Sequence, residues 1–202
     1  MDNFKSVFRE YDIRGRVKTG ELDEVNFRRI AEGFAVYLSK RGIDSVVVGY
    51  DNRKVSPCFA EAAVKIFFER GFTVYNLGMC ITPAAYFAQY HLRVLGLMMV
   101  TASHNPDGWC GCKLGDGFSK TLNPAEIREL YGCCTAENYA PAAESGPGRV
   151  IEYDIRKPYI EDIVSRAAAP PNDLRIVVDA GNGAAGVYAW ELFQKLGYLT
   201  FQ

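Results

Sequence analysis

The sequence predicts an α/β protein with a mostly parallel mixed sheet and helices on both faces, followed by the start of a second, similar α/β unit. Two observations predict this fold. Short apolar, β-branched runs alternate with segments of helical periodicity along most of the 202 residues. Glycine or proline stands where most of the helical segments would begin or end. Such alternation is typical of parallel strands joined by crossover helices.

The first predicted elements follow one another closely. Apolar residues recur at near-helical spacing across 23–41 and a glycine comes next, which predicts a helix that ends there. Residues 45–50 (SVVVGY) form a compact β-branched run, typical of a strand buried on both faces. A helix is expected over 56–70, because Ser56 can cap it and Pro57 suits its first turn.

The remainder of the first unit continues the alternation. It is expected to contain a strand over 72–77, a short helix over 83–91, a strand over 94–100 and a helix over 124–133.

A change in composition then indicates a loop or hinge, since residues 136–148 are rich in Ala, Pro, Gly and Ser. The elements expected beyond it are a helix over 154–168, a strand over 175–179, a glycine turn over 180–186, a helix over 187–196 and a strand over 198–201. We therefore expect a first domain at 1–150, and a linker helix with the beginning of a second domain at 151–202. A lone strand–helix–strand unit has little core, so we expect it to belong to a longer parent chain.

Charge and hydropathy exclude several classes of function. The 23 basic and 24 acidic residues are interspersed and give a net charge of −1, so no global field attracts nucleic acid or an anionic membrane. The N-terminus lacks the apolar segment of a signal peptide, and no apolar run approaches the ~18 residues of a membrane span. We expect a cytoplasmic protein without nucleic-acid or membrane partners, in which local donors bind any anionic ligand.

The six cysteines are interpreted as reduced thiols. One Cys-X-Cys and one adjacent pair, with only two histidines, do not match the spaced pairs of zinc sites or a regular disulfide framework.

The most informative segment is 101–106 (TASHNP), which directly follows the strand predicted over 94–100. Open α/β sheets bind ligands at the carboxyl ends of their strands, where Ser103 would present its hydroxyl. His104 is adjacent and Lys113 lies a short loop away, so a base and a cation are near a serine nucleophile. Taken alone, the pattern also fits an ordinary loop.

Three other segments carry charged or glycine-rich patterns. Residues 8–15 (FREYDIRG) hold two arginines that match phosphate geometry, or they form an exposed edge strand with surface charges. Residues 49–54 (GYDNRK) could bind an anion or form an Asp–Arg surface pair. Residues 179–186 (DAGNGAAG) resemble a dinucleotide-binding glycine loop but suit a strand-to-helix turn better, because the ribose-binding acid of that fingerprint is expected about 20 residues further on, where this sequence stops.

Four segments together resemble one family. Residues 8–15, 49–53, 101–106 and 177–186 (VVDAGNGAAG) agree in order and spacing with the α-D-phosphohexomutases, and most with their phosphomannomutase/phosphoglucomutase branch. The later GCK at 111–113 also fits. The resemblance spans nearly the whole chain. It implies an enzyme of four domains around a central cleft, of which this chain would form the first domain and the beginning of the second.

The resemblance also implies roles for individual residues. Ser103 would be a phosphoserine that donates its phosphoryl group to a hexose monophosphate and takes one back from the bisphosphate intermediate, and its phosphate would help to hold Mg²⁺. Arg14 and Lys113 would neutralise charge on the transferred group, and Lys113 or His104 would take part in proton transfer. The residues implied in substrate binding are Tyr11, Arg14 and Asn105.

The sequence departs from the family pattern at two points. Cys110 stands where the family usually has Asn, which removes an amide that could hydrogen-bond near Lys113. The metal-binding loop, the sugar-selecting loop and the C-terminal phosphate-binding loop of the family have no counterpart in the 202 residues.

These expectations lead to one leading interpretation and two alternatives. The chain would be the N-terminal part of a Mg²⁺-dependent phosphohexomutase that interconverts hexose 1-phosphate and 6-phosphate, of mannose or glucose, and it would be inactive alone. The first alternative is a non-catalytic module that binds a sugar phosphate or a protein partner. A nucleotide-binding Rossmann domain built on Gly181 and Gly183 is the second. A reading frame that continues past Gln202 into an Asp-Gly-Asp-Gly-Asp-type loop would favour the enzyme.

Overall fold

The computed structural model describes residues 3–18, 20–136, 146–167 and 173–202. A seven-stranded sheet dominates it, with strand order β1-β5-β4-β2-β3-β7 and β6 paired to β5. Its strands are β1 (Ile13–Arg16), β2 (Ser45–Tyr50), β3 (Thr73–Met79), β4 (Gly96–Val100), β5 (Trp109–Gly117), β6 (Lys120–Thr121) and β7 (Arg149–Glu152). β4, β2, β3 and β7 are parallel, whereas β5 is antiparallel to both β4 and β1. The predicted α/β class and mostly parallel mixed sheet are therefore confirmed.

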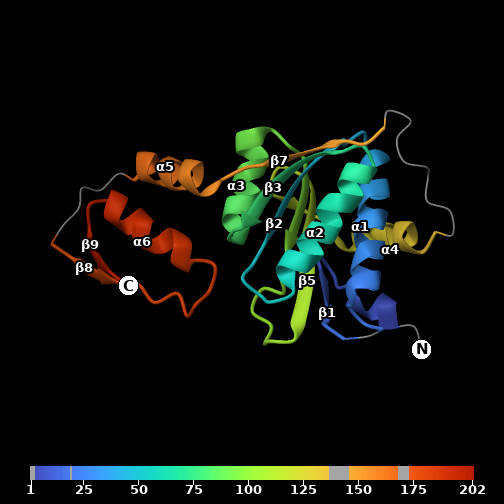
Figure 1. Cartoon of the computed structure of the whole chain (residues 1–202), viewed down its shortest axis with the longest axis horizontal. Coiled ribbons are helices and arrows are strands. Elements are labelled where there is room, and N and C mark those ends of the chain that lie inside the picture. Colours follow the sequence, from blue (N-terminus) through green and yellow to red (C-terminus); the bar gives the residue numbers. More distant parts are fainter. Residues whose placement is uncertain (1–2, 19, 137–145, 168–172) are drawn as a thin grey trace.

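Helices cover both faces of this sheet (Figure 1). The described helices are the 3-10 helix η1 (Asn3–Val7) and the α-helices α1 (Glu24–Ser39), α2 (Ser56–Glu69), α3 (Thr82–Leu92), α4 (Pro124–Thr135), α5 (Arg156–Arg166) and α6 (Gly186–Lys195), of which α5 and α6 lie beside the large sheet with β8 and β9. α1, α2 and α4 pack on one face, and α3 packs on the other. Val46 and Val48 of β2 enter the first of these cores and Val47 enters the second, which explains its continuous apolar run. None of the described helices is long and apolar enough to cross a membrane.

Three strands were not predicted, β5, β6 and β7, of which β6 has only two residues. β5 contains Gly111 and alternates small residues, so its sequence resembles a loop. Gly111 is required there because a Cβ would collide with the backbone carbonyl of Ile13 in the neighbouring strand β1. β7 is only four residues long and follows the Pro/Gly-rich segment, yet it pairs with β3.

The prediction that Ser56 caps α2 is wrong. Val55 occupies the N-cap position without a side-chain hydrogen bond, and Ser56 is already the first residue of the helix. The buried Ser56 hydroxyl instead donates to Asp51 Oδ1 at 2.6 Å, so it links α2 to the end of β2.

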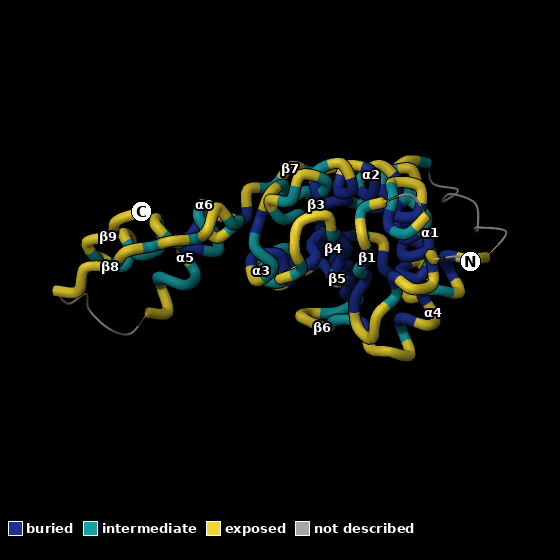
Figure 2. The backbone as a smooth tube through the Cα atoms, turned by 90° about the horizontal axis from the view of Figure 1, so that it is seen from below, coloured by how far each residue is buried: buried dark blue, intermediate teal, exposed yellow. Residues whose placement is uncertain are grey.

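A smaller unit follows, in which the parallel strands β8 (Arg175–Val177) and β9 (Leu199–Phe201) are joined by α6. Tyr188 of α6 is 4% exposed and belongs to the same core cluster as residues of α3 and α5. Figure 2 shows that buried residues concentrate in the large sheet, whereas the small unit is mostly half-buried or exposed. The division at 150/151 stays a prediction, and β7 spans it.

Candidate active site

The predicted serine lies in a sharp turn at the carboxyl end of β4. Ser103 is exposed and has a left-handed backbone with φ of 56°, a conformation that few non-glycine residues adopt. Its amide donates to Thr101 Oγ1 at 2.9 Å, and the Asn105 amide donates to the Ala102 carbonyl at 3.1 Å. Ser103 Oγ lies 3.2 Å from His104 Nδ1, so the two side chains form a hydrogen bond.

Arg53 holds this turn in place. Its guanidinium donates to four backbone carbonyls, those of Ser103 (3.1 Å), Asn105 (2.6 Å), Pro106 (3.0 Å) and Trp109 (3.2 Å). Asp51 Oδ2 accepts a hydrogen bond from Arg53 Nε at 3.2 Å. Both side chains are mostly buried, with 17% of Arg53 and 14% of Asp51 exposed. Of the two interpretations of residues 49–54, the structure favours an Asp–Arg pair, but one that supports the serine turn rather than one on the open surface.

Asp12 joins the two predicted catalytic cations. This carboxylate is 3% exposed and accepts Arg14 Nε at 2.9 Å and Nη2 at 2.7 Å. Lys113 Nζ lies 3.6 Å from the same oxygen and 5.6 Å from the centre of the Tyr11 ring. Arg14 also donates to Asn105 Oδ1 at 3.0 Å, which ties the cations to the serine turn.

Strand pairing explains why these cations meet. Arg14 of β1 pairs with Gly111 of β5, and Lys113 lies two residues further along the same strand. Successive strand residues alternate between faces, so Gly111 and Lys113 share a face. Ile13 and Cys112 point into the core beneath α1, α2 and α4, which leaves Arg14 and Lys113 on the opposite face.

Two hollows adjoin the serine turn. One, of about 820 Å³, is lined by Ser103, His104 and Asn105 on one side and by the glycine turn that begins at Gly181 on the other. The second, of about 400 Å³, is lined by residues that include Tyr11, Arg14, His104 and Asn105. His104 and Asn105 line both hollows. The structure therefore brings together every predicted site residue, although Lys113 joins the group only through Asp12 and Tyr11.

The glycine turn of the small unit faces the serine turn. Asn52 Nδ2 donates to the Asn182 carbonyl at 2.6 Å, across the two units. The turn was expected to serve a strand-to-helix connection, and it does so between β8 and α6. Its position as a wall of the larger hollow was not predicted.

Cys110 does not point into the site. Its sulfur is buried 3.7 Å from Ser56 Oγ, and burial raises the pKa of the Cys110 thiol. The six cysteines are free thiols, and only Cys58 among them is exposed. Cys110, which stands where the family usually has Asn, therefore places a sulfur in the core. Lys113 still contacts Asp12.

The described residues do not form a metal site by themselves. No group of three or more His, Cys, Asp or Glu side chains among them is arranged to hold an ion. Mg²⁺ binds oxygen ligands in octahedral geometry, and usually takes only one or two carboxylates together with phosphate oxygens.

Comparison with known proteins matches the first unit to one family. The description "Phosphoglucomutase/phosphomannomutase, alpha/beta/alpha domain I" fits residues 5–140. The chain belongs to the phosphoglucomutase/phosphomannomutase family. The resemblance inferred from the four sequence segments is confirmed.

Individual members of the phosphoglucomutase/phosphomannomutase family match nearly the whole chain. A phosphoglucomutase of Neisseria meningitidis serogroup B is 34% identical over 195 residues, which cover 96% of this chain and 41% of that protein. A phosphomannomutase of Salmonella typhimurium is 34% identical over 183 residues, which cover 90% and 39% of the two chains. A crystal structure of a family protein from Burkholderia thailandensis superimposes with a TM-score of 0.87 at 32% identity, over 97% of this chain and 43% of that one. The chain thus spans about two fifths of the length of these relatives.

Proposed function

We propose that this chain is the N-terminal, phosphoserine-bearing part of a Mg²⁺-dependent phosphohexomutase. The proposed reaction interconverts the 1-phosphate and 6-phosphate of a hexose, mannose or glucose, through a hexose bisphosphate. The observation that carries the proposal is one cluster, in which the exposed Ser103 lies beside His104, and Arg14, which donates to Asn105 of the same turn, shares the buried Asp12 with Lys113. Phosphoryl transfer requires mainly positioning and neutralisation of charge, which this cluster can supply.

Each proposed step assigns a role to residues of the cluster. A hydroxyl of the hexose monophosphate attacks the phosphorus on Ser103 while the bond between phosphorus and Ser103 Oγ breaks. The hydroxyl proton is transferred to the leaving Ser103 Oγ, and Lys113 or His104 takes part in that transfer. The reverse step, after the bisphosphate reorients, returns the other phosphoryl group to Ser103. Arg14 balances the charge of the transferred group, and Tyr11 and Asn105 contact the sugar phosphate.

The magnesium ion is part of the proposal. When bound, it would neutralise charge on the phosphoryl group. Ser103 would contribute one phosphate oxygen, and the proposal assigns the other ligands to a loop elsewhere in the full-length protein. The proposal also includes a cytoplasmic location and no nucleic-acid or membrane partner, in keeping with the net charge of −1.

Phosphorylation of Ser103 tests the assignment. We expect glucose 1,6-bisphosphate labelled with ³²P to label the full-length protein on Ser103, and Ser103→Ala to abolish the labelling. Ser119→Ala is the matched control, because Ser119 is also an exposed serine with a left-handed backbone, at φ of 51°. Label on any residue other than Ser103 would contradict the proposal.

The 202-residue chain alone is expected to lack mutase turnover, because the proposal places metal binding and sugar selection elsewhere. A coupled assay for conversion of glucose 1-phosphate measures this, with the full-length protein as the positive control. Turnover by the 202 residues alone would refute this part of the proposal. Binding of hexose phosphate without turnover by the full-length protein would favour the non-catalytic module instead.

A further inference from the structure

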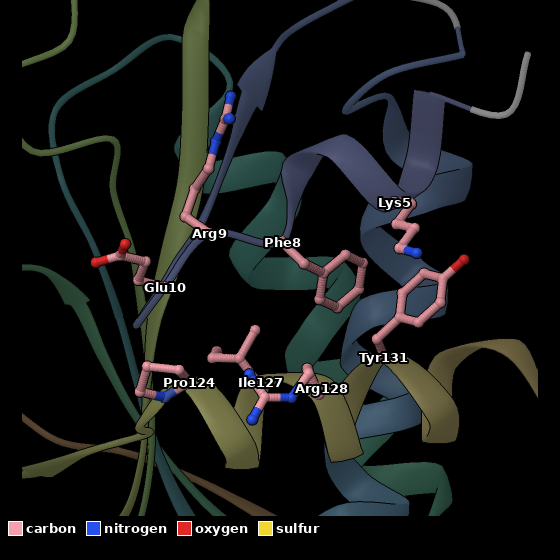
Figure 3. Close-up of a pocket in the computed structure, with 8 residues that line it drawn as sticks. All are labelled: Lys5, Phe8, Arg9, Glu10, Pro124, Ile127, Arg128 and Tyr131. Atoms are coloured by element: carbon pink, nitrogen blue, oxygen red, sulfur yellow. The ribbon is translucent and has the colours of Figure 1, made fainter.

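A third cavity, of about 590 Å³, lies between the N-terminal segment and α4 (Figure 3). Its volume is within the range of small-molecule sites. Neither Ser103, His104, Lys113 nor Arg14 lines it. This cavity is therefore distinct from the two hollows beside the serine turn.

Its apolar wall is rigidly packed. The rings of Phe8 and Tyr131 meet edge to face with centroids 5.1 Å apart, and Phe4 packs against Phe8 in the same way at 5.2 Å. Ile127, which is 3% exposed, lies between these rings and Pro124 along α4. Edge-to-face packing fixes the rings, so the apolar surface exists before any ligand binds.

The rim of the cavity is positively charged. Lys5, Arg9 and Arg128 are exposed there, against one carboxylate, Glu10. Within the described part of the chain, none of these three cations forms an ion pair, whereas Arg14 of the serine site is bound to a carboxylate. The chain as a whole carries a net charge of −1, so this concentration of cations without carboxylate partners among the described residues is local. Lys5 Nζ lies 5.9 Å from the centre of the Tyr131 ring, which places a cation directly at the aromatic wall.

We propose that this cavity binds a small aromatic anion, a carboxylate, sulfonate or phosphate carried on an aromatic ring. The ring of such a ligand would pack on Phe8 and Tyr131, and its anionic group would contact Lys5 and Arg128. Arg9 and Glu10 also line the 400 Å³ hollow beside His104, so the ligand would share a wall with the serine site. The inference does not depend on the proposed phosphoryl transfer.

Fluorescence titration of the 202-residue chain with 8-anilinonaphthalene-1-sulfonate tests the inference. N-phenyl-1-naphthylamine, which has the same rings without the sulfonate, is the neutral counterpart. We expect saturable binding of one sulfonate probe per chain, and binding of the neutral probe that is about tenfold weaker. Lys5→Gln/Arg128→Gln should weaken sulfonate binding about tenfold and leave the neutral probe unchanged. The matched control is Lys157→Gln/Arg175→Gln, which removes two exposed cations elsewhere that also lack ion pairs with the described residues.

The position of the bound probe is measured by ¹H–¹⁵N NMR. We expect the largest shift changes in residues 127–131 of α4 and in Phe8. Changes centred on α6 and β9, whose apolar residues are also exposed, would overturn the proposal. So would equal affinity for the two double variants. Equal affinity for the charged and neutral probes would overturn the requirement for an anion.

Discussion

The two strand–helix–strand regions of this chain share one pattern but bury their side chains very differently. In β2, Val46, Val47 and Val48 are all fully buried. In the small unit, Val177 of β8 is 78% exposed and Leu199 of β9 is 57% exposed. The difference in burial follows from the neighbouring elements. β2 has strands on both sides and helices on both faces, whereas β8 and β9 pair with each other and α6 packs on β9. An apolar strand sequence therefore indicates what a strand can bury, and the neighbouring elements decide whether it does.

The serine site depends on both regions. Ser103 and the cluster around Asp12 rest on the well-packed sheet, whereas one wall of the 820 Å³ hollow is the glycine turn of the exposed unit. Among the described residues, the two regions meet through Tyr188 in the core of α3 and α5 and through the Asn52–Asn182 hydrogen bond.

The largest contrast is expected from one substitution made in both regions. Leu97→Ala in β4 removes a fully buried side chain and should lower the free energy of unfolding by about 2–5 kcal/mol. Leu199→Ala in β9 should change it by less than about 0.5 kcal/mol, because that side chain is already mostly exposed. Urea unfolding followed by circular dichroism measures both. A cost for Leu199→Ala close to that of Leu97→Ala would show that the small unit is covered in solution.

A smaller contrast is expected from two Arg–Asp pairs of different exposure, Arg53–Asp51 and Arg166–Asp162. Arg53→Ala should lower the free energy of unfolding by about 2 kcal/mol. The substitution leaves Asp51 and the backbone carbonyls of the serine turn without the guanidinium that donates to them. Arg53→Lys should restore little of this, since lysine lacks the planar fork that reaches several acceptors.

The comparison pair is Arg166–Asp162 on α5, outside the large sheet, with Arg166 76% exposed. Arg166→Ala is therefore expected to leave stability unchanged in the same unfolding assay. If Arg53→Ala were equally silent, the proposed support of the serine turn by Arg53 would be wrong.

The sequence predicts most of the fold because the strands and helices of the large sheet have strong local patterns. The strand predicted over 45–50 has the bounds of β2, and the serine turn lies at the end of β4 as expected. β5 was missed because glycines and cysteines conceal a strand whose identity depends on pairing with β1, about a hundred residues earlier. The cap at Ser56 was misassigned because Asp51 competes for its hydroxyl.

The residues that support the site were harder to predict than those that face it. Ser103, His104 and Asn105 are neighbours in one motif, so the sequence alone places them together. The contacts of Asp12 with Lys113 and of Arg53 with the serine turn cross long sequence distances, and no local pattern reports them. The only signal for Asp12 in the sequence is its place next to Tyr11 and two residues before Arg14.

The smallest of these effects should appear at alkaline pH and should belong to the large sheet and the helices packed on it, where all six cysteines lie. Burial raises the pKa of the Cys80 thiol from 9.0 to about 12. In the unfolded chain this thiol ionises near pH 9, while in the folded protein it stays protonated. Its contribution to stability is therefore complete below pH 9 and is lost as the pH rises towards 12, at about 1.4 kcal/mol per pH unit. Cys80→Ala should reduce the slope of unfolding free energy against pH by that amount between pH 9.5 and 11. Cys58→Ala, at the exposed thiol, should reduce it less. An unchanged slope in Cys80→Ala would mean that Cys80 is accessible to water in the folded protein, and the core it shares with Tyr188 of the small unit would then be open at the junction of the two regions.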